Sequence, residues 1–444
     1  MSLYVFFNWL FCIITAVLLI VIFLRYRFLF IKPSFMFLTF FHVQIQWAAT
    51  IQSAYIENFL MYPYPFFILA QIFPLLGLVV SFFVLHKKTK QVYSRIYGLD
   101  IFSFKLKEKN ILILFSMILI IVMFYLLRVP LSHTGFYAIF LDPLNSAFAR
   151  ESSLKLLDSW ILRYSFSFLK SALAPLLSVL ITIYFFQNLK KTNILKSLIS
   201  IFVFFFILIA VSIPGGRTPL AMLILTVFLA FYFRKGMPVR PVHIIFVFVL
   251  ILIFPVLMTV FREGKEFNLS LMGVYLKGGI FKRVFVVPMQ TGLWHVHYAQ
   301  EMGFLGITGI QKLAMLFGVE PINISNIIYW KYTTYSVYSG LSNTCFVFLY
   351  YSCFGLVSII FSFLGLWALD FSILVFAKIK DGAILLAVIA SIASSAFYFV
   401  STSYTTALIT NGFVILLIVS LILDKFSKNT IVEENKTKEF NNEN

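Results

Sequence analysis

Basic residues gather between residues 261 and 344, among aromatic residues and between hydrophobic stretches. Four of these cations are Arg262, Lys265, Lys282 and Arg283. Guanidinium and ammonium groups bind phosphate, and aromatic rings pack on acyl chains or on the faces of sugars. The segment therefore suits a ligand that is anionic, partly lipid and partly sugar.

The same segment contains the run Trp294-His295-Val296-His297-Tyr298, with Glu301 shortly after it. Neutral imidazole titrates near the working pH, so His295 or His297 could take a proton from a hydroxyl group, and Glu301 is another base available in the same segment. Two histidines separated by one residue diverge on a helix, and no third ligand follows at the spacing of a metal motif. We expect no metal and no other cofactor.

A turn with Pro214-Gly215-Gly216-Arg217-Thr218-Pro219 precedes an apolar stretch. Thr218 can cap the following helix and Pro219 can occupy its first turn, so the backbone N–H groups of that helix start here. Two glycines let a phosphate approach the backbone, and Arg217 supplies a two-pronged donor. The turn predicts an anion site; the alternative is a tight turn whose arginine meets lipid headgroups.

A second polar segment spans about residues 129–162 and contains Ser132-His133-Thr134-Gly135-Phe136. Leu154, Leu157 and Ile161 follow at helical spacing, which predicts a helix along the membrane surface. His133 is the residue of this segment that could bind a substrate. The alternative is a connector at the membrane interface.

The elements that must hold these residues are transmembrane helices. The chain is 61% hydrophobic and only 12% charged, which a soluble domain could not bury. We predict an all-α polytopic membrane protein with about eleven transmembrane helices and short interfacial helices in the lid, residues 261–344. The expected spans are 3–24, 34–52, 64–85, 111–128, 163–186, 197–213, 219–233, 243–260, 345–369, 383–401 and 405–423.

The distribution of charge predicts the orientation of these spans. Of the 35 Lys and Arg residues, 22 follow the odd-numbered spans, Lys32 among them, so those connections are cytoplasmic by the positive-inside rule. The N-terminus is then outside and the C-terminus inside, with residues 129–162 and 261–344 outside. Residues 1–423 form one predicted transmembrane domain, and residues 424–444 a disordered cytoplasmic tail. The net charge of +18 is explained by the membrane, and we expect no nucleic-acid partner.

The layout resembles the Wzy-type O-antigen and oligosaccharide repeat-unit polymerases of bacterial inner membranes, most closely the enterobacterial common antigen polymerase branch. The resemblance rests on Gly215-Gly216-Arg217 at the start of a span, on Phe261-Arg262-Glu263-Gly264 at the end of the next, and on the lid. The loop with His133-Thr134-Gly135-Phe136 and the approach Tyr338-Ser339-Gly340-Leu341-Ser342 are similar too.

This resemblance implies a GT-C-like, metal-independent glycosyltransferase in the cell inner membrane, with its reaction on the periplasmic face. It would transfer a growing glycan from undecaprenyl pyrophosphate to a sugar hydroxyl of the next lipid-linked unit, and a co-polymerase that sets chain length is expected from the family. Arg217, Arg262 and Arg283, with Lys282 and Lys265, would hold pyrophosphate. His295 or His297, then His133 and Glu301, would position or deprotonate the acceptor.

Two alternatives stay open. An O-antigen ligase would use the same donor and a lipid A core as acceptor, a difference that residues alone do not reveal. A lipid-linked oligosaccharide flippase or other transporter usually has a repeat between its halves and short outside loops, whereas this sequence shows no such repeat and has a long lid.

Overall fold

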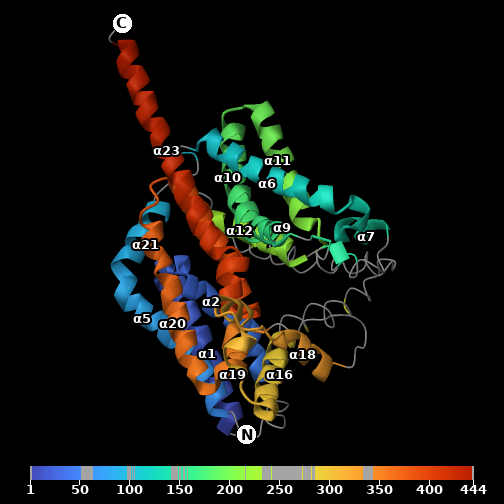
Figure 1. The fold of residues 1–444 in the computed structure, drawn as a ribbon. Coiled ribbons are helices and arrows are strands. Elements are labelled where there is room, and N and C mark those ends of the chain that lie inside the picture. The colour runs from blue at the N-terminus through green and yellow to red at the C-terminus, as the bar shows by residue number, and fades with distance from the viewer. Residues whose placement is uncertain are drawn as a thin grey trace. The chain divides into compact units, whose positions relative to one another are not determined.

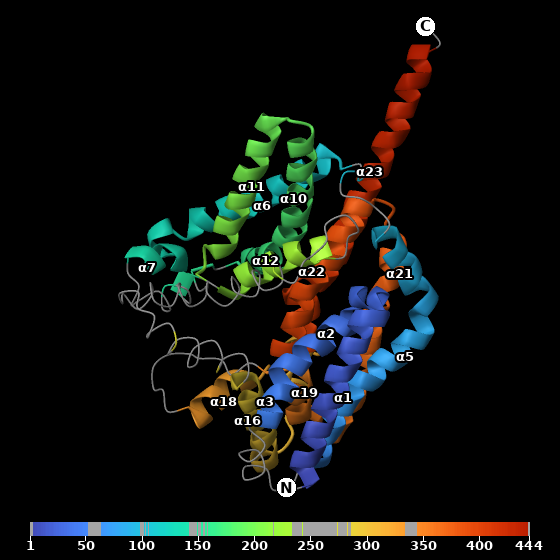
Figure 2. The ribbon, with the colours of Figure 1, turned by 180° about the vertical axis from the view of Figure 1, so that it is seen from behind.

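A computed structural model describes most of residues 3–51, 64–97, 102–141, 149–232, 286–333 and 344–442, with a few isolated positions such as Lys282. The predicted span 243–260 and most of the lid before residue 286 lie outside the described residues. Within the described ranges every regular element is helical, as the ribbon shows from two sides (Figures 1 and 2).

Six of the described helical stretches are long and apolar enough to cross a membrane, and the number rises to eight if two bent pairs each count as one span. The six are Val5–Ile22, Glu108–Arg128, Ile161–Lys190, Ile194–Ser212, Gly382–Ser401 and Thr406–Ser427. The chain is therefore a multi-pass helical membrane protein.

The other five predicted spans have different outcomes. Residues 64–85 and 345–369 fall in the bent pairs, which turn by 57° and 52°. Residues 219–233 match a shorter apolar helix, Thr218–Tyr232, and residues 34–52 are divided among three short elements. Since the eighth predicted span is not described, the count of eleven stays a prediction.

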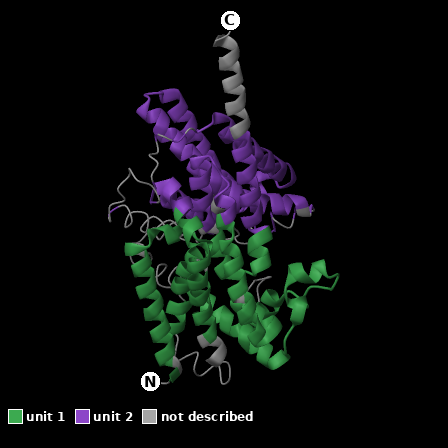
Figure 3. Ribbon diagram, turned by 90° about the vertical axis from the view of Figure 1, so that its left-hand side faces the viewer, with its two compact units in different colours: residues 1–90, 273–373, 395–409 green, residues 91–272, 374–394, 410–444 purple. Residues whose placement is uncertain are grey.

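The chain divides into two compact units (Figure 3). Unit 1 comprises residues 1–90, 273–373 and 395–409, and unit 2 comprises residues 91–272, 374–394 and 410–444. Four elements contribute to both: α5 (Tyr64–Tyr97), α21 (Ser372–Phe376), α22 (Gly382–Ser401) and the π-helical η10 (Thr406–Thr410). The prediction of one transmembrane domain over residues 1–423 stays a prediction.

The N-terminal helices of unit 1 pack with helices from the middle of the chain. Its elements are α1 (Leu3–Arg25), η1 (Arg27–Ile31), α2 (Pro33–Phe41), η2 (His42–Gln46), α3 (Trp47–Ile51), α16 (Val287–Met302), η8 (Gly306–Gly309), α17 (Gln311–Leu316), α18 (Ile324–Tyr332), α19 (Phe346–Phe354), η9 (Gly355–Val357) and α20 (Ser358–Asp370). Helix α2 lies against α20, and α16 against α19. Short helices are predicted in the lid, and α17 is one short helix found there; Gly318, at φ +67°, lies two residues after its end.

A buried ionic contact joins α2 to α20. The side chains of Lys32 and Asp370 are 0% exposed, with Nζ 3.9 Å from Oδ2. Ser34 donates to the same carboxylate through its backbone N–H at 2.9 Å and through its hydroxyl at 2.6 Å. Lys32, which the charge pattern counts among the cations of a cytoplasmic connection, is thus buried, because a carboxylate far along the chain holds it inside.

Unit 2 is built from the middle of the chain and the C-terminal helix. Its elements are α6 (Glu108–Arg128), η4 (Leu131–His133), α7 (Gly135–Leu141), α9 (Trp160–Phe168), η6 (Leu169–Leu173), α10 (Ala174–Lys190), α11 (Ile194–Ser212), α12 (Arg217–Tyr232) and α23 (Phe413–Asn442). Helices α10, α11 and α12 contact one another. Helix α23 continues into the segment for which composition predicts disorder.

Carboxylates fix the start of α22 and the middle of α23 within unit 2. Asp381 accepts from the backbone N–H groups of Ala383 and Ile384, at 2.9 and 3.1 Å, and so caps α22. Asp424 on α23 accepts from the N–H groups of Lys380 and Asp381, both at 2.8 Å. This network satisfies backbone donors that the helix start leaves without partners.

Candidate functional site

Helix α16 positions the two histidines singled out in the sequence. Pro288 stands in its first turn and Gly303, at φ +84°, follows its last residue. Gly292 lets α16 lie tightly against α19, since a Cβ there would come within 2.7 Å of the Phe348 ring. One side of α16 is thereby buried, and the other carries His297 and Glu301, which stand one helical turn apart.

Four side chains from α16 and α18 form what we call the His297 cluster: His297, Glu301, Lys331 and Tyr332. The Tyr332 hydroxyl lies 2.8 Å from His297 Nδ1 and donates to Glu301 Oε2 at 3.2 Å. Lys331 Nζ donates to the same carboxylate oxygen. Glu301 Oε1 lies 3.5 Å from His297 Nδ1. The cluster is at the surface, with Glu301 42% and His297 28% exposed.

Charge and burial set the protonation of the cluster. The hydrogen bond from Lys331 lowers the pKa of the Glu301 carboxyl, while burial and the Glu301 charge raise the pKa of Tyr332. Tyr332 therefore stays protonated, and its hydroxyl donates a hydrogen bond to Glu301. With the Tyr332 proton directed to Glu301, the Tyr332 oxygen accepts from Nδ1 of a neutral His297, and in this arrangement the lone pair of the imidazole lies on Nε2. This is the tautomer of a general base.

Aromatic rings flank the cluster. The rings of Trp294 and Tyr332 stack with centroids 5.9 Å apart and planes within 10°. The Lys331 ammonium lies over the Tyr298 ring at 5.4 Å from its centroid. Trp330, on the same helix as Tyr332, is 50% exposed. A base, a carboxylate, a cation and the stacked ring of Trp294 are thus grouped at the surface, and such a group matches the hydroxyls and apolar face of a sugar.

His295 differs sharply from His297 although both lie on α16. Its side chain is fully buried, and its Nδ1 lies 2.8 Å from the Thr291 carbonyl oxygen, to which it donates. Its Nε2 has no hydrogen-bond partner among the described residues. Burial lowers the pKa of His295 to about 4, so it stays neutral at ordinary pH. The geometry favours His297 over His295 for contact with a substrate.

A second set of predicted residues meets in unit 2. The backbone N–H of Phe136 donates to the Ile213 carbonyl at 3.0 Å, which joins the His133 loop to the turn before α12. A Cβ on Gly135 would lie 2.3 Å from the Pro214 carbonyl oxygen, and Gly215 has φ +78°. Two segments about 80 residues apart in the chain are thus held together through glycines. His133 itself is exposed, with Nδ1 3.4 Å from the Ser132 hydroxyl.

The remaining predicted residues are found as follows. Arg217 is the first residue of α12, with Pro219 in the first turn. Lys282 is exposed, and its carbonyl accepts from the Val286 N–H at 2.9 Å. Arg262, Lys265 and Arg283 lie outside the described residues. His297 and Glu301 meet in unit 1, and His133 and Arg217 belong to segments that meet in unit 2.

Sequence reasoning missed Tyr332, which links His297 to Glu301. The i, i+4 spacing of His297 and Glu301 could have indicated their contact, but Tyr332 is 35 residues from His297 and no local pattern connects the two. Within the described part of the chain, no group of three His, Cys, Asp or Glu residues is arranged to hold a metal ion.

Comparisons with protein-family models, with curated proteins and with solved structures find no match for this chain.

Proposed function

We propose that this protein polymerises oligosaccharide repeat units carried on undecaprenyl pyrophosphate at the outer face of a bacterial inner membrane. The growing glycan leaves its pyrophosphate and passes to a sugar hydroxyl of the incoming lipid-linked unit. The observation that carries the proposal is the His297 cluster, a surface base held in one tautomer by Tyr332 and Glu301 beside aromatic rings.

The cluster suits the acceptor half of this reaction. The acceptor hydroxyl gives its proton to His297 Nε2 while its oxygen bonds to the anomeric carbon. The bond from that carbon to pyrophosphate breaks, and the electron pair leaves with the phosphate oxygen. Glu301 supports the imidazolium that forms, since a carboxylate nearby stabilises its positive charge.

The donor half of the reaction needs cations near the departing pyrophosphate. The turn before α12 supports this assignment, because the closely packed Gly135 and Gly215 bring the His133 loop to the start of the helix that Arg217 opens. Arg262, Arg283, Lys282 and Lys265 complete the proposed set of phosphate ligands. A guanidinium binds two phosphate oxygens at once, which suits a leaving group whose charge grows.

The test is incubation of the purified protein with a single defined undecaprenyl-pyrophosphate repeat unit. We expect a ladder of products that differ by one repeat. Unchanged substrate that crosses a vesicle bilayer would indicate a flippase. Transfer that occurs only when a lipid A core is added would indicate a ligase.

Variants then test the phosphate-binding residues. We expect Arg217→Ala and Arg283→Ala to insert normally and to lower the rate at which repeats are added by at least tenfold. Loss of one charge-assisted hydrogen bond to the transition state reduces a rate by about this factor. Lys425→Ala, on an exposed residue of α23, is the matched loss of a cation and should leave the ladder intact. Normal ladders from both arginine variants would remove these residues from the site.

A further inference from the structure

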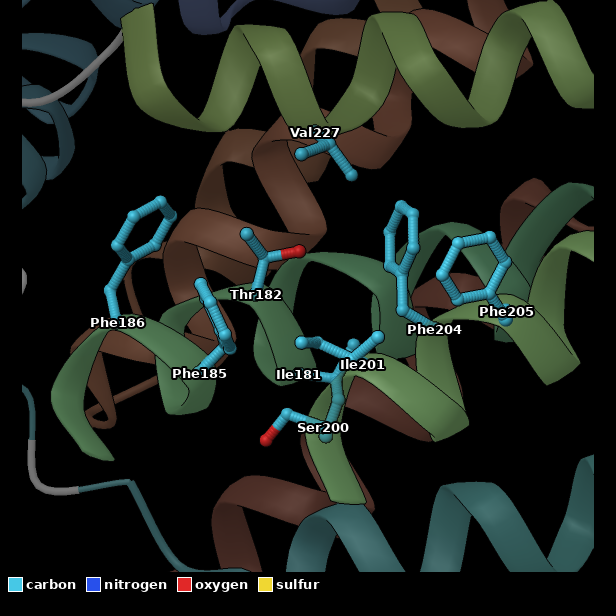
Figure 4. Close-up of a pocket in the computed structure, with 9 residues that line it drawn as sticks. All are labelled: Ile181, Thr182, Phe185, Phe186, Ser200, Ile201, Phe204, Phe205 and Val227. Atoms are coloured by element: carbon cyan, nitrogen blue, oxygen red, sulfur yellow. The ribbon is translucent and has the colours of Figure 1, made fainter. Parts of the chain in front are cut away.

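Unit 2 contains an apolar cavity that the proposed reaction does not use. It has a volume of about 270 Å³ and lies among α10, α11 and α12 (Figure 4). Phe185 and Phe186 line it from α10, Phe204 and Phe205 from α11, and Val227 from α12. Figure 4 shows Val227 pointing from α12 toward the side chains of the other two helices. Phe205 is 59% exposed, so the cavity opens to the surface of the helices.

The cavity offers almost no hydrogen-bonding capacity to a ligand. Its two hydroxyl groups belong to Thr182 and Ser200. Thr182 donates to the Ser178 carbonyl at 2.6 Å, and Ser200 donates to the Lys196 carbonyl at 2.7 Å. Because both hydroxyl protons are used within their own helices, the cavity offers a ligand no donor and only the lone pairs of two hydroxyl oxygens, so it favours hydrocarbon over a polar group.

Cations stand one helical turn beyond the cavity on both neighbouring helices. Lys190 follows Phe186 by four residues on α10, and Lys196 precedes Ser200 by four residues on α11. Lys190 is exposed, with its ammonium 4.2 Å from the centre of the Phe102 ring. Lys191 is exposed in the connection between the two helices, which the charge pattern predicts to be cytoplasmic.

One carboxylate offsets part of this charge. Glu108 Oε1 lies 2.5 Å from Lys196 Nζ, and the Tyr184 hydroxyl donates to the same oxygen at 2.7 Å. Both side chains of the ion pair are exposed, at 41% for Lys196 and 61% for Glu108. Lys190 and Lys191 therefore leave this end of the hairpin with a net positive charge.

We infer that this cavity binds an acyl chain of an anionic phospholipid of the cytoplasmic leaflet, whose headgroup lies against Lys190 and Lys191. Hydrocarbon walls with cations one turn away complement a molecule with an apolar chain and an anionic head. The isoprenoid chain of a lipid carrier is the other occupant to consider. Its phosphate would be expected near Arg217, which is ten residues or about 15 Å along α12 from Val227, whereas Lys190 is about 6 Å along α10 from Phe186 in the cavity wall.

Native mass spectrometry of the full chain tests this inference. The protein in detergent is mixed with phosphatidylglycerol or with phosphatidylcholine of identical acyl chains, and the lipid that stays bound after the detergent is removed is measured. We expect the anionic lipid to be retained about fivefold more than the zwitterionic one, the effect of about one basic residue at a membrane surface. The double variant Lys190→Gln, Lys191→Gln should lose that preference, because it removes the two cations that Glu108 does not offset. Lys378→Gln, another exposed cation of unit 2, should keep it.

Filling the cavity tests the acyl-chain contact separately. Ile201→Trp puts an indole ring in place of an aliphatic side chain in the wall of the cavity and should reduce retention of both lipids. Phe202→Trp is the control, because Phe202 is 68% exposed and does not line the cavity, and it should leave retention unchanged. Val227→Phe fills the same space from α12 if Ile201→Trp does not fold. Equal retention of the two lipids by the parent chain, unchanged retention in a folded cavity variant, or displacement of phosphatidylglycerol by equimolar undecaprenyl phosphate would overturn the inference.

Discussion

The chemistry proposed for the outer face depends on one hydroxyl group. Tyr332 fixes the His297 tautomer and passes a hydrogen bond to Glu301, yet its ring also stacks on Trp294. Tyr332→Phe removes the hydroxyl and keeps the ring. We expect this variant to extend the glycan about tenfold more slowly, because a positioned base contributes rate that an unpositioned one does not. The measurement is the rate of ladder formation against pH.

Tyr329→Phe is the matched control, since it removes a hydroxyl from the same helix without touching the His297 cluster. It should polymerise at the parent rate. If Tyr332→Phe keeps both the parent rate and the parent pH profile, His297 is not held by this hydrogen bond during the reaction.

His295 has a different consequence, which concerns stability rather than catalysis. Its pKa is about 4 in the fold, against 6.5 as the reference for an unfolded chain. Between these values the unfolded state binds a proton that the folded state does not, so the free energy of unfolding falls as the pH drops from 6.5 toward 4. The loss is about 3 kcal/mol at most, from about 1.4 kcal/mol for each pH unit.

Thermal unfolding in detergent at pH 7 and at pH 4.5 measures this dependence. His295→Gln should flatten the pH dependence relative to the parent chain, whatever its effect on stability at pH 7. His133→Gln, at an exposed histidine, should leave the dependence as it is. An unchanged slope in His295→Gln would mean that His295 gains its proton without unfolding the chain.

At the scale of elements, the contact between the His133 loop and the turn before α12 depends on a missing side chain. Gly135→Ala would force a methyl group against the Pro214 carbonyl oxygen, where a Cβ would lie at 2.3 Å. We expect destabilisation by about 2 kcal/mol, typical of overpacking, together with a weaker ladder because the start of α12 shifts. The melting temperature and the activity of the purified variant check both effects.

Gly77→Ala is the control for this substitution. Gly77 lies within α5, where a Cβ would meet its nearest neighbour at 3.6 Å, an ordinary contact distance. Alanine there should be neutral or slightly stabilising. Equal behaviour of the two variants would show that the close approach at Gly135 relaxes without cost.

The sequence predicts elements well where the cause is local. Hydropathy over about 20 residues finds α1, α6 and α11, because crossing hydrocarbon demands a continuous apolar stretch. It does not reveal that the π-helical η2 interrupts the stretch 34–52. Mean hydropathy depends only on which residues are present, so it does not change when one helical turn is π-helical instead of α-helical. The burial of Lys32 was missed for a related reason: its partner Asp370 lies in another part of the chain.

At the scale of the whole molecule, the charge pattern predicts which connections between helices face the cytoplasm. Labelling of single introduced cysteines can test this prediction, because the native cysteines are buried. Cys12, Cys345 and Cys353 are all buried, so the parent chain should react poorly with a maleimide that cannot cross membranes. In intact spheroplasts we expect Glu320→Cys, in the lid, to be labelled at once. Lys191→Cys, between α10 and α11, should be labelled only after permeabilisation.

The opposite labelling pattern would reverse the topology and place the His297 cluster in the cytoplasm, away from any lipid-linked sugar displayed outside.

The candidate site could be predicted only in part from the sequence. Histidines, arginines and glycines could be chosen from the sequence by their chemistry, but which of them meet depends on contacts such as that of Phe136 with Ile213, which no local spacing encodes.

The ionic contact between Lys32 and Asp370 also constrains how the protein is made. Ribosomes add about 5 to 20 residues each second, so the lysine is incorporated roughly 20 to 70 seconds before its aspartate. During that interval the ammonium group must stay hydrated in the translocon or at a headgroup, and α2 cannot settle into its final depth. Biogenesis of the N-terminal helices is therefore completed only when nearly the whole polypeptide has been translated.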